Sequence, residues 1–365
     1  MKKIFYIAEL NLPSKSAYAI HVMKMCDAFK INGNKVKLLT YNLLKNSNIY
    51  KKYNCEKKFE ILSFFKLRKD FFFKRILFSI KIINYFIWND KYDFIISRRI
   101  ISAIFLSIFK KNIFLEVHHE FSGFTKILFD FTKNFKFFKK ITFIFISNNL
   151  SNVFKITNKK LILDDAVNLN NFLTKSKSKK KMSCVYTGSF AKGKSLEKII
   201  QISKLAKKIN FDLYGDFINS EFNINDLNKY RNIKYKGNLP YNEIPKILSE
   251  YHVALMPYSN KVYVRASNIE TSQYMSPMKM FDYLASKNII IATKLEVYDH
   301  ILNNSNSLLI KKNSPRLWAK KIKYIFSNLG KFKNTKKKAY ETAKKYTWNK
   351  RVNKIIESLE EINCK

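Results

Sequence analysis

The stretch SPMKMFDYLASKNIIIAT, residues 276–293, predicts a helix that leads into a buried strand. Ser276 is a favourable N-cap residue, and Pro277 is a favourable first residue of a helix. The β-branched run at 289–291 follows the helix and is typical of a strand. The segment therefore has the pattern of one helix-to-strand step in a parallel α/β sheet.

The start of this predicted helix has the features of an anion-binding site. The backbone N–H groups that follow Pro277 would point out of the positive end of the helix, which suits a diphosphate. Lys279 adds a positive charge near that end, and Asp282 could accept hydrogen bonds from the hydroxyls of a ribose. A capped core helix with one exposed acid would give the same pattern, so the residues alone leave both interpretations open.

Strand and helix patterns alternate along the whole chain, which predicts parallel sheets. After a strand at 3–10, the residues Val22, Met25, Cys26 and Phe29 are spaced to form one apolar helix face. Gly33 follows as expected of a residue just past a helix end. The other predicted strands lie at 35–41, 59–65, 92–98, 112–117, 141–147, 183–189, 210–216, 232–238, 252–258, 288–293 and 306–310.

The length of 365 residues and the hydrophobic content of 47% indicate two domains, each with a sizeable core. The basic run TKSKSKKKM at 174–182 has the composition of a linker. We therefore expect Rossmann-like α/β domains at 1–173 and 183–345, facing each other across a cleft at their strand ends. The segment 346–365 is an amphipathic helix that either lies on the surface or crosses back to the first domain.

The formal net charge of +42 suggests an anionic partner, either nucleic acid or an anionic membrane surface. Most of the basic residues are lysines, whereas a protein that reads nucleic acid would favour arginine for bidentate contacts. No nucleic-acid partner is therefore expected. An anionic lipid surface remains an expected partner, at about 1 kcal/mol for each well-placed basic residue.

No uncharged apolar run is long enough to predict a membrane span. The most apolar stretch, at 71–88, is interrupted by Lys74, Arg75 and Lys81. The start, MKKIFYIAEL, has too short an apolar run for a signal peptide. A cytoplasmic protein is expected. Peripheral attachment to the inner face of the cytoplasmic membrane is left open.

Disulfides and metal sites are not expected. The sequence has no Asp-x-Asp motif, because Asp164 and Asp165 are adjacent. The four cysteines are scattered without a CxxC pair, which argues against a disulfide framework and a zinc site. They are Cys26, Cys55, Cys184 and Cys364.

SPMKMFDYLASKNIIIAT resembles the nucleotide-sugar motif of family 4 glycosyltransferases of GT-B architecture, in which a SPLKLFEYMA form is common. Other segments resemble the same family in the same order, so the resemblance covers nearly the whole chain. They are IAELNLPSKSAYAIHVMKMCDAF (7–29), LEVHH (115–119), LDDAVNLNNF (163–172), VYTGSFAKGKSLEKII (185–200), YKGNLPYNEIPKIL (235–248), HVALMPY (252–258) and YTWNKRV (346–352).

The resemblance implies that the second domain binds the nucleotide-sugar donor. Lys192 would pair with the donor diphosphate, and the segment 276–278 would offer backbone N–H groups to it. Asn238 and Leu239 would lie beside the nucleobase, and Asp282 matches the second acid of the family's E-x7-E motif, which holds the ribose. The residues implied to contact the donor are Ser189, Lys192, Asn238, Leu239, Arg265, Ser276, Pro277, Met278, Lys279 and Asp282.

Two positions depart from the family pattern. Ser189 stands near where many relatives have an arginine for the donor phosphates, and Arg265 or Lys279 would cover that loss. Tyr274 stands where the first acid of the E-x7-E motif would be, although relatives with the SPLK form often lack that acid too. In relatives this acid faces the transferred sugar, so the sugar selected is left open.

The first domain is implied to form the acceptor side. The resemblance implies that His118 contacts the donor sugar near the reacting centre, whereas strand alternation directs His119 to the opposite face. A structural histidine is the alternative for His118. Together with Lys192 and Asp282, His118 makes up the set of residues implied to act in catalysis.

The loop at 13–21 is implied to approach the acceptor. Ser14, Lys15 and Ser16 could contact a phosphate there. Ordinary loop polarity and helix capping would account for these residues equally well.

Taken with the resemblance, the sequence predicts a retaining hexosyltransferase that needs neither metal nor cofactor and uses a UDP- or GDP-linked sugar as co-substrate. The expected acceptor is a glycan or a polyprenyl-diphosphate-linked sugar in the synthesis of a bacterial surface polysaccharide, capsule or lipopolysaccharide. The aromatic and basic stretches at 64–88 and 121–140 could lie on the inner membrane face. Ordinary core helices with solvated lysines are the alternative for these stretches.

Three other functions stay open. A sugar-nucleotide epimerase would share the fold but act without an acceptor. A basic protein that binds nucleic acid or another anionic surface would show strongly salt-dependent binding. An inactive relative that serves as a scaffold is suggested by Ser189 and Tyr274, and it would bind no donor.

Overall fold

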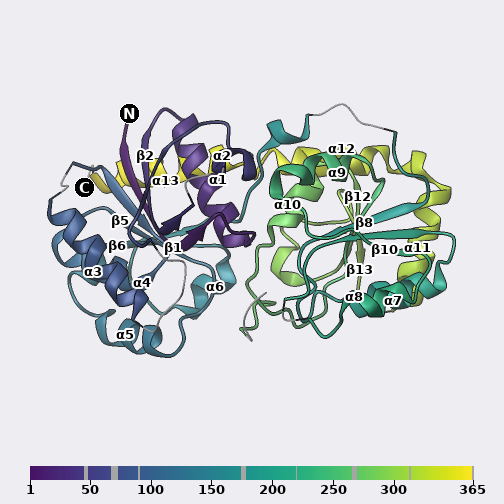
Figure 1. The fold of residues 1–365 in the computed structure, drawn as a ribbon, viewed down its shortest axis with the longest axis horizontal. Coiled ribbons are helices and arrows are strands. Elements are labelled where there is room, and N and C mark those ends of the chain that lie inside the picture. The colour runs from purple at the N-terminus through teal and green to yellow at the C-terminus, as the bar shows by residue number, and fades with distance from the viewer. Residues whose placement is uncertain are drawn as a thin grey trace. The chain divides into compact units, whose positions relative to one another are not determined.

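The computed structural model describes residues 1–44, 48–66, 73–88, 91–173, 178–218, 220–264, 269–311 and 314–363. Its contacts divide the chain into two compact units (Figure 1). Unit 1 comprises Met1–Asp164 together with Trp348–Lys365, and unit 2 comprises Asp165–Thr347.

Unit 1 is built on a parallel sheet of seven strands in the order β3-β2-β1-β4-β5-β6-β7. Buried apolar residues fill β1, β4, β5 and β6, as expected of strands that are covered on both faces. The strands are β1 (Lys3–Leu12), β2 (Lys35–Leu43), β3 (Glu60–Ser63), β4 (Phe94–Ser97), β5 (Ile113–Val117), β6 (Ile141–Phe145) and β7 (Lys160–Ile162).

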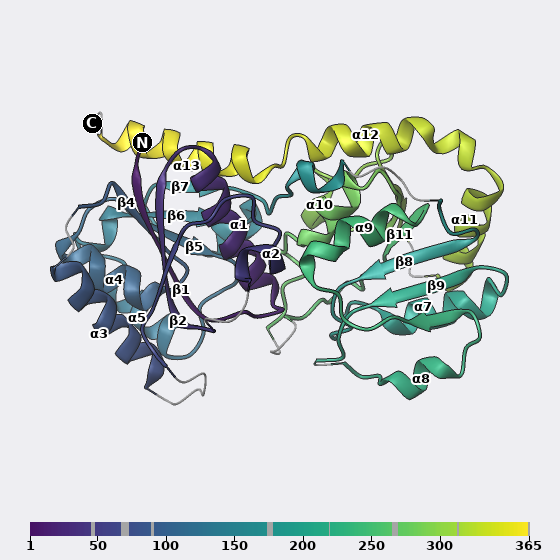
Figure 2. The ribbon, with the colours of Figure 1, turned by 45° about the horizontal axis from the view of Figure 1, so that its top comes forward.

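Helices cover both faces of this sheet (Figure 2). Helices α1 and α13 pack against each other on one face, and α4 packs between α3 and α5 on the other. The helices are α1 (Ala17–Ile31), α2 (Ile49–Lys52), α3 (Lys74–Ile87), α4 (Ile100–Phe109), α5 (Phe124–Thr132), the short turn η1 (Phe138–Lys140), α6 (Asn148–Val153) and the C-terminal α13 (Trp348–Asn363).

Unit 2 is built on a parallel sheet of six strands in the order β10-β9-β8-β11-β12-β13. Helices α7 and α11 pack together over one apolar core, and α9, α10 and α12 contribute to a second one. The strands are β8 (Ser183–Thr187), β9 (Asn210–Tyr214), β10 (Ile233–Tyr235), β11 (Val253–Met256), β12 (Ile289–Thr293) and β13 (Leu308–Ile310). The helices are α7 (Leu196–Leu205), α8 (Ile224–Asn228), α9 (Ile244–Ser249), α10 (Met278–Ala285), α11 (Pro315–Ser327), α12 (Lys333–Ala343) and the turns η2 (Leu169–Phe172), η3 (Tyr241–Glu243), η4 (Glu296–Tyr298) and η5 (Leu329–Phe332).

The predicted fold class is confirmed, with two Rossmann-like α/β units and a C-terminal helix that packs on the first. Every strand predicted from the sequence is present, and β7 is an additional short strand that the sequence did not reveal. Val22, Met25, Cys26 and Phe29 are fully buried on α1. Gly33 follows that helix with a positive φ of 80°, the conformation that glycine adopts most readily.

The C-terminal helix α13 belongs to unit 1 rather than to the surface of unit 2. The side chain of Asn32, beside α1, donates a 2.7 Å hydrogen bond to Asn353. Trp348 is buried with its ring 5.0 Å from the ring of His21 on α1. Of the two interpretations of segment 346–365, the structure therefore has the helix that crosses back.

The chain passes from unit 1 to unit 2 at Asp165, ahead of the expected domain end at 173. The backbone N–H of Asp165 donates to the Ser276 hydroxyl over 3.0 Å, and that of Val167 donates to the Tyr346 carbonyl over 3.0 Å. These bonds tie 165–167 to unit 2. Of the expected linker at 174–182, residues 174–177 lie outside the described residues, and the backbone N–H of Lys180 bonds to Glu250 in unit 2.

Two predictions from the sequence concern membrane spans and disulfides. No helix within the described ranges combines the length and the hydropathy that crossing a bilayer would require. Cys26, Cys55 and Cys184 are free thiols, as their spacing suggested, and Cys364 lies outside the described residues.

Candidate functional site

The carboxyl ends of β8 and β9 meet in two glycine turns of unit 2. Gly188 follows β8 with a φ of 118°, and Gly215 follows β9. A Cβ on Gly215 would lie 1.9 Å from the Gly188 carbonyl oxygen, and a Cβ on Gly188 would lie 2.8 Å from Nζ of Lys279. Glycine at both positions therefore lets the backbone and the Lys279 amine approach one another at the strand ends, where α/β sheets bind ligands.

Lys279 brings a buried amine to this turn. Its Nζ is buried and has no hydrogen-bond partner among the described residues. The Nζ lies 3.7 Å from the centroid of the Tyr186 ring and 5.3 Å from that of Tyr258. Burial, followed by the positive charge of Lys194, holds the pKa of Lys279 well below its usual range. An anion bound here would supply the missing partner and favour the charged amine.

Lys194 was not singled out from the sequence, although it is the second lysine of AKGK (191–194). Its Nζ donates a 2.7 Å hydrogen bond to the hydroxyl of the buried Ser189. Ser189 is the position at which many relatives have an arginine, so a lysine from five residues later brings positive charge to that position. The structure thus brings Ser189, Lys194 and Lys279 together around the turn at Gly188.

Lys192, the lysine implied by the resemblance, lies apart from that group of contacts. Its half-exposed side chain places Nζ 3.7 Å from a carboxylate oxygen of Glu221 and 5.5 Å from the centroid of the Tyr263 ring. All three residues line a cavity of about 370 Å³ in unit 2. A role for Lys192 toward a donor phosphate remains a prediction.

The start of helix α10 differs from the sequence prediction. Pro277 is the N-cap with an extended backbone, φ −78° and ψ 120°, and the first helical residue is Met278. Ser276 does not cap the helix, because its hydroxyl instead accepts the 3.0 Å hydrogen bond from the Asp165 backbone. The predictions of Ser276 as N-cap and Pro277 as first helical residue were therefore wrong by one position. The N–H groups of the first turn still follow Pro277.

Asp282 lies on α10 and is buried rather than exposed, with 5% of its surface accessible. One carboxylate oxygen accepts a 3.3 Å hydrogen bond from the hydroxyl of Tyr241, at the start of η3. The alternative of an exposed acid on a core helix is thus excluded for this residue. Its proposed contact with a ribose stays a prediction.

Two of the remaining donor-side residues, Asn238 and Leu239, follow the end of β10. The amide of Asn238 donates a long 3.4 Å hydrogen bond to Asp216, which directly follows Gly215. Leu239 is partly buried against the core that includes α10. Tyr274 is buried and donates a 2.8 Å hydrogen bond to the Glu270 carbonyl, so a tyrosine anchored to the backbone occupies the position of the first acid. Arg265 lies outside the described residues.

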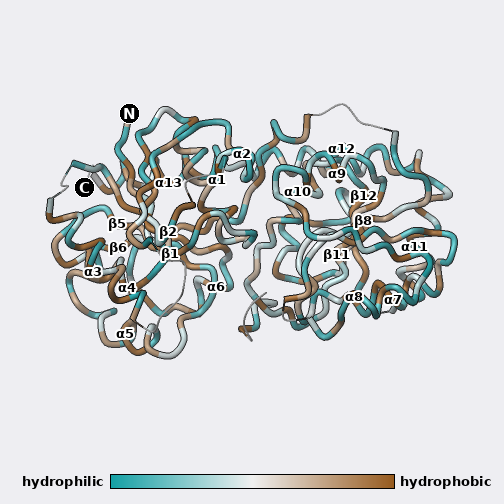
Figure 3. Tube along the Cα trace, viewed as in Figure 1, coloured by the Kyte–Doolittle hydropathy of each residue, from teal (hydrophilic) through white to brown (hydrophobic). Residues whose placement is uncertain are grey.

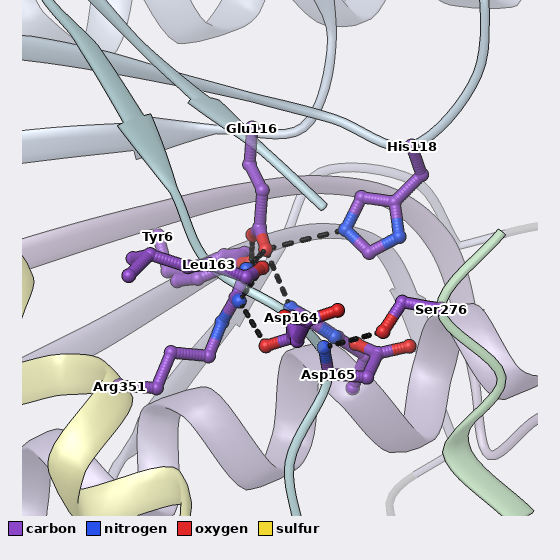
Figure 4. Close-up of polar contacts among 9 residues, drawn as sticks. Tyr6, Glu116, His118, Leu163, Asp164, Asp165, Ser276 and Arg351 are labelled. Atoms are coloured by element: carbon purple, nitrogen blue, oxygen red, sulfur yellow. Dashed lines mark hydrogen bonds and ion pairs between the residues drawn. The ribbon is translucent and has the colours of Figure 1, made fainter. Parts of the chain in front are cut away.

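In unit 1, His118 belongs to a buried cluster around Glu116, the fourth residue of β5 (Figure 4). His118 Nε2 and His21 Nε2 lie 3.2 Å and 2.7 Å from the same oxygen of Glu116. The hydroxyl of Tyr6 donates a 2.5 Å hydrogen bond to the other oxygen. His119 makes a separate contact, in which its Nδ1 lies 2.8 Å from the carbonyl oxygen of its neighbour Glu120.

Arg351 closes this cluster from helix α13. Its NH2 group lies 2.5 Å from the Glu116 carboxylate, and its NH1 group donates to the carbonyls of Leu163 and Asp164. Figure 4 shows the arginine reaching both groups at once. Arg351 therefore links the sheet, the last residues before the chain leaves unit 1, and the helix that returns to it.

Charge fixes the protonation of the cluster. Burial alone would raise the pKa of Glu116, but His21, Arg351 and Arg98 hold that pKa well below its usual range. Burial, with a further contribution from Arg98, lowers the pKa of His118 to about 3. Glu116 is thus an anion and His118 is neutral, so the His118 Nε2–H donates to Glu116. The other ring nitrogen, Nδ1, is then a hydrogen-bond acceptor.

Among the described residues, this cluster is the one group of side chains whose ligand atoms lie close enough together to hold a metal ion. Ligand atoms of His21, Glu116 and His118 lie within 4.8 Å of one another. However, Arg351 already pairs with the Glu116 oxygen that both histidines approach. A cation would have to displace the guanidinium or lie beside it, so the residues present fit a metal poorly.

The loop that was expected to face the acceptor is organised by capping. Ser16 is the N-cap of α1 and accepts a 3.2 Å hydrogen bond from the Ala19 backbone, and Ser14 donates to Ser16 over 3.0 Å. Tyr53 also bonds to the Ser14 backbone, whereas Lys15 is exposed. The capping interpretation is confirmed for Ser16, and the acceptor role of all three remains a prediction.

An arginine cluster near β1 and β4 of unit 1 was not foreseen. Arg99 and Arg75 place their Nε atoms 3.2 Å and 3.7 Å from one oxygen of the buried Glu9. The guanidinium of Arg98 lies 4.6 Å from the centroid of the Tyr18 ring. The sequence signal was present, because the adjacent pair at 98–99 comes directly after a strand in a chain with few arginines.

Comparison with protein families matches residues 196–357 to a family described as glycosyl transferase-like. No curated protein matches the chain in sequence. The match begins at the first residue of α7 and runs into α13, so it covers most of unit 2, including Asp282 and Lys279.

Solved structures match the chain over nearly its whole length. A glycosyltransferase from Rickettsia africae has a TM-score of 0.72 and 17% identity, covering 99% of this chain and 98% of its own. HepE from Anabaena with UDP-glucose has a TM-score of 0.72 and 11% identity, covering 99% and 100%. WaaG, a glycosyltransferase involved in lipopolysaccharide biosynthesis, has a TM-score of 0.65 and 10% identity, covering 98% and 99%. The chain therefore has the GT-B fold of these glycosyltransferases, and most of its second unit matches the glycosyl transferase-like family.

Proposed function

We propose that this protein is a retaining, metal-independent glycosyltransferase that uses a nucleoside-diphosphate sugar. The observation that carries the proposal is the buried Lys279 amine, which lies at the Gly188 turn without a hydrogen-bond partner among the described residues. A buried amine without a partner is costly, and a diphosphate would supply acceptor oxygens together with the negative charge that favours the charged form of the amine. The comparisons support the choice of ligand, because HepE binds UDP-glucose with the same fold.

The donor would lie along the strand ends of unit 2. Its diphosphate would contact Lys279, Lys194 and the first turn of α10, where the N–H groups favour negative charge. The ribose would bond to Asp282, beside Tyr241, and the base would lie near Asn238. Lys192 would approach the phosphates from the neighbouring cavity.

Catalysis would depend on the leaving group. As the bond from the sugar to the diphosphate breaks, negative charge develops on the phosphate oxygens, and fixed cations and N–H groups stabilise that charge. Lys279 and Lys194 are held in place before the reaction by packing and by Ser189. The acceptor hydroxyl would form the new bond to the sugar carbon as the bond to the diphosphate breaks, and its proton would pass to the departing phosphate oxygen. The step therefore needs no nucleophilic side chain.

In unit 1, His118 would position a substrate hydroxyl rather than act as an acid. Its Nε2–H is committed to Glu116, and its neutral ring leaves Nδ1 as an acceptor for a hydroxyl of the sugar. Glu116 and Arg351 are positioning residues, because they act on the substrate only through the orientation of this ring.

The acceptor would be a glycan or a polyprenyl-diphosphate-linked sugar of a surface polysaccharide, made at the cytoplasmic face of the membrane. WaaG, which has the same fold, is involved in lipopolysaccharide biosynthesis. Arg75 and Arg99 share the single carboxylate of Glu9, so this edge of unit 1 retains a positive charge suited to an acceptor phosphate. We therefore include in the proposal that the transferred sugar is a hexose and that the product is part of a capsule or a lipopolysaccharide.

Calorimetric titration with a panel of UDP- and GDP-sugars tests the proposal. One nucleotide class should bind, and Asp282→Ala should weaken it by about 1–3 kcal/mol, as expected for a lost hydrogen bond to a charged group. Asp299→Ala, at an exposed acid of the same unit, is the matched control and should bind as the parent does. Donor turnover without an acceptor would indicate an epimerase, and a folded protein that binds none of the panel would indicate a scaffold.

A further inference from the structure

Three neighbouring helices of unit 1 expose a large amount of apolar surface. On α5, Phe124, Ile127 and Phe131 are 62%, 69% and 70% exposed. Their spacing places them along one side of the helix, whereas Phe129 points into the core. This helix therefore has apolar residues on its outer side as well as on its inner side.

The two adjacent helices repeat this pattern. On α4, Phe105, Ile108 and Phe109 are exposed, and on α3 the exposed apolar residues include Ile80 and Trp88 at the helix end, the latter at 81%. Figures 1 and 2 show α3, α4 and α5 side by side on the same face of the sheet, and α4 packs against both of the others. The exposed large hydrophobic residues of these helices are Phe73, Ile76, Leu77, Ile80, Ile87, Trp88, Phe105, Ile108, Phe109, Phe124, Ile127 and Phe131.

Unit 2 has no comparable group among its described residues. Its exposed large hydrophobic residues lie singly on different elements, and they are Leu173, Met182, Leu205, Ile218, Ile224 and Tyr324. Figure 3 shows α4 mainly in the hydrophobic colour and α12 mainly in the hydrophilic one. Apolar residues scattered singly are ordinary on a protein surface, whereas a concentration on three packed helices marks an interaction site.

The charges around these helices indicate the partner. Lys81 on α3, Lys111 after α4 and Lys126 on α5 are exposed. The nearby acid Asp130 is already paired with Lys133 over 2.8 Å. Exposed lysines continue after α5 at positions 136, 139 and 140. Bulky apolar residues bordered by lysines, with a tryptophan at a helix end, match the composition of a surface that lies in the headgroup region of an anionic bilayer.

We propose that the outer sides of α3, α4 and α5 form a docking surface for anionic phospholipid. The apolar side chains enter the boundary between headgroups and acyl chains, and the lysines contact lipid phosphates. Attachment through the outer sides of these three helices would be peripheral and reversible. This inference does not depend on the proposed enzymatic activity, and an acceptor linked to a lipid would be one reason for it.

Co-sedimentation with lipid vesicles tests the proposal. The parent protein should bind vesicles containing phosphatidylglycerol, bind pure phosphatidylcholine weakly, and lose affinity as salt is raised. The double variant Ile127→Ser, Phe131→Ser should bind anionic vesicles at least about tenfold more weakly, because two apolar side chains no longer leave water. The control Ile224→Ser, Tyr324→Ser removes exposed apolar residues of unit 2 and should bind as the parent does.

Both double variants alter exposed residues, so thermal unfolding should verify that they fold. Equal binding of the α5 variant and the parent would overturn the proposal, as would the absence of parent binding to anionic vesicles. Self-association of the parent that the α5 variant abolishes, without vesicle binding, would show that the surface joins copies of the protein instead.

Discussion

The buried carboxylate of Glu116 in unit 1 has several polar partners, whereas the buried amine of Lys279 in unit 2 has no hydrogen-bond partner among the described residues. Glu116 is surrounded by His21, His118, Arg351 and Tyr6, so its charge is balanced within the unit. Lys279 has two aromatic rings beside its amine but no hydrogen-bond acceptor among the described residues. The first arrangement is complete by itself, and the second one is suited to a ligand that brings negative charge.

The largest effect should come from breaking the complete cluster. Arg351→Met leaves the Glu116 carboxylate buried with less balancing charge, and it also frees the carbonyls of Leu163 and Asp164. The free energy of unfolding should fall by about 3–5 kcal/mol, measured by urea denaturation. Arg316→Met, at an exposed arginine of α11, should have almost no effect, and equal effects of the two variants would contradict the account.

The variant Lys279→Met should raise the free energy of unfolding, whereas Arg351→Met should lower it. Replacing the buried amine by a methyl thioether in Lys279→Met removes a polar group without a partner, so the ligand-free protein should become more stable by about 1–3 kcal/mol. Urea denaturation without nucleotide measures this change. Lys320→Met, at an exposed lysine of α11, is the control. Loss of stability in Lys279→Met would mean that the amine has a structural partner.

The histidine of the cluster predicts a dependence on pH. The folded pKa of His118, about 3, is below its unfolded value, so the unfolded chain binds the extra proton first. The contribution of His118 to stability should therefore be lost as the pH falls from about 6.5 toward the folded value. Histidine NMR should show that His118 stays neutral above a pH of about 5. Protonation of His118 near pH 6.5, the ordinary value for a histidine, would contradict the assignment.

The smallest change in stability is expected for a substitution in the loop before α1. Ser16→Ala removes the N-cap hydrogen bond to Ala19 and should lower the free energy of unfolding by about 1 kcal/mol. If Ser16 only caps the helix, the KM for the acceptor should not change. A raised acceptor KM in Ser16→Ala, with Lys15→Ala as a comparison that leaves the cap intact, would support the acceptor role.

The sequence predicted the fold well because its signals are local. Strands buried on both faces read as apolar runs such as 141–145, and α1 has a helical apolar face that ends near Gly33. The short strand β7 was missed because its three residues are only partly buried and give no such run. Periodicity and capping residues are sufficient to place elements of ordinary length.

The candidate site was predicted less completely because it depends on contacts distant in sequence. The N-cap of α10 was misplaced because Ser276 bonds to Asp165, 111 residues earlier, rather than to its own helix. The partners of His118 could not be read either, because Arg351 lies 235 residues after Glu116. Lys194 was missed although its contact is local. Its amine reaches Ser189, five residues earlier, where many relatives have an arginine. The residue pattern gave no reason to choose Lys194 over Lys192.

The most direct test of the central claim is the affinity of Lys279→Met for the nucleoside diphosphate of the donor, measured by calorimetry beside the parent and Lys320→Met. If Lys279 is held for the diphosphate, the variant should bind about 10- to 100-fold more weakly, as for a lost charge-assisted hydrogen bond. The parent should also take up a proton on binding, because the bound anion raises the depressed pKa of Lys279. Equal affinity of the variant and the parent, with no proton uptake, would contradict the account.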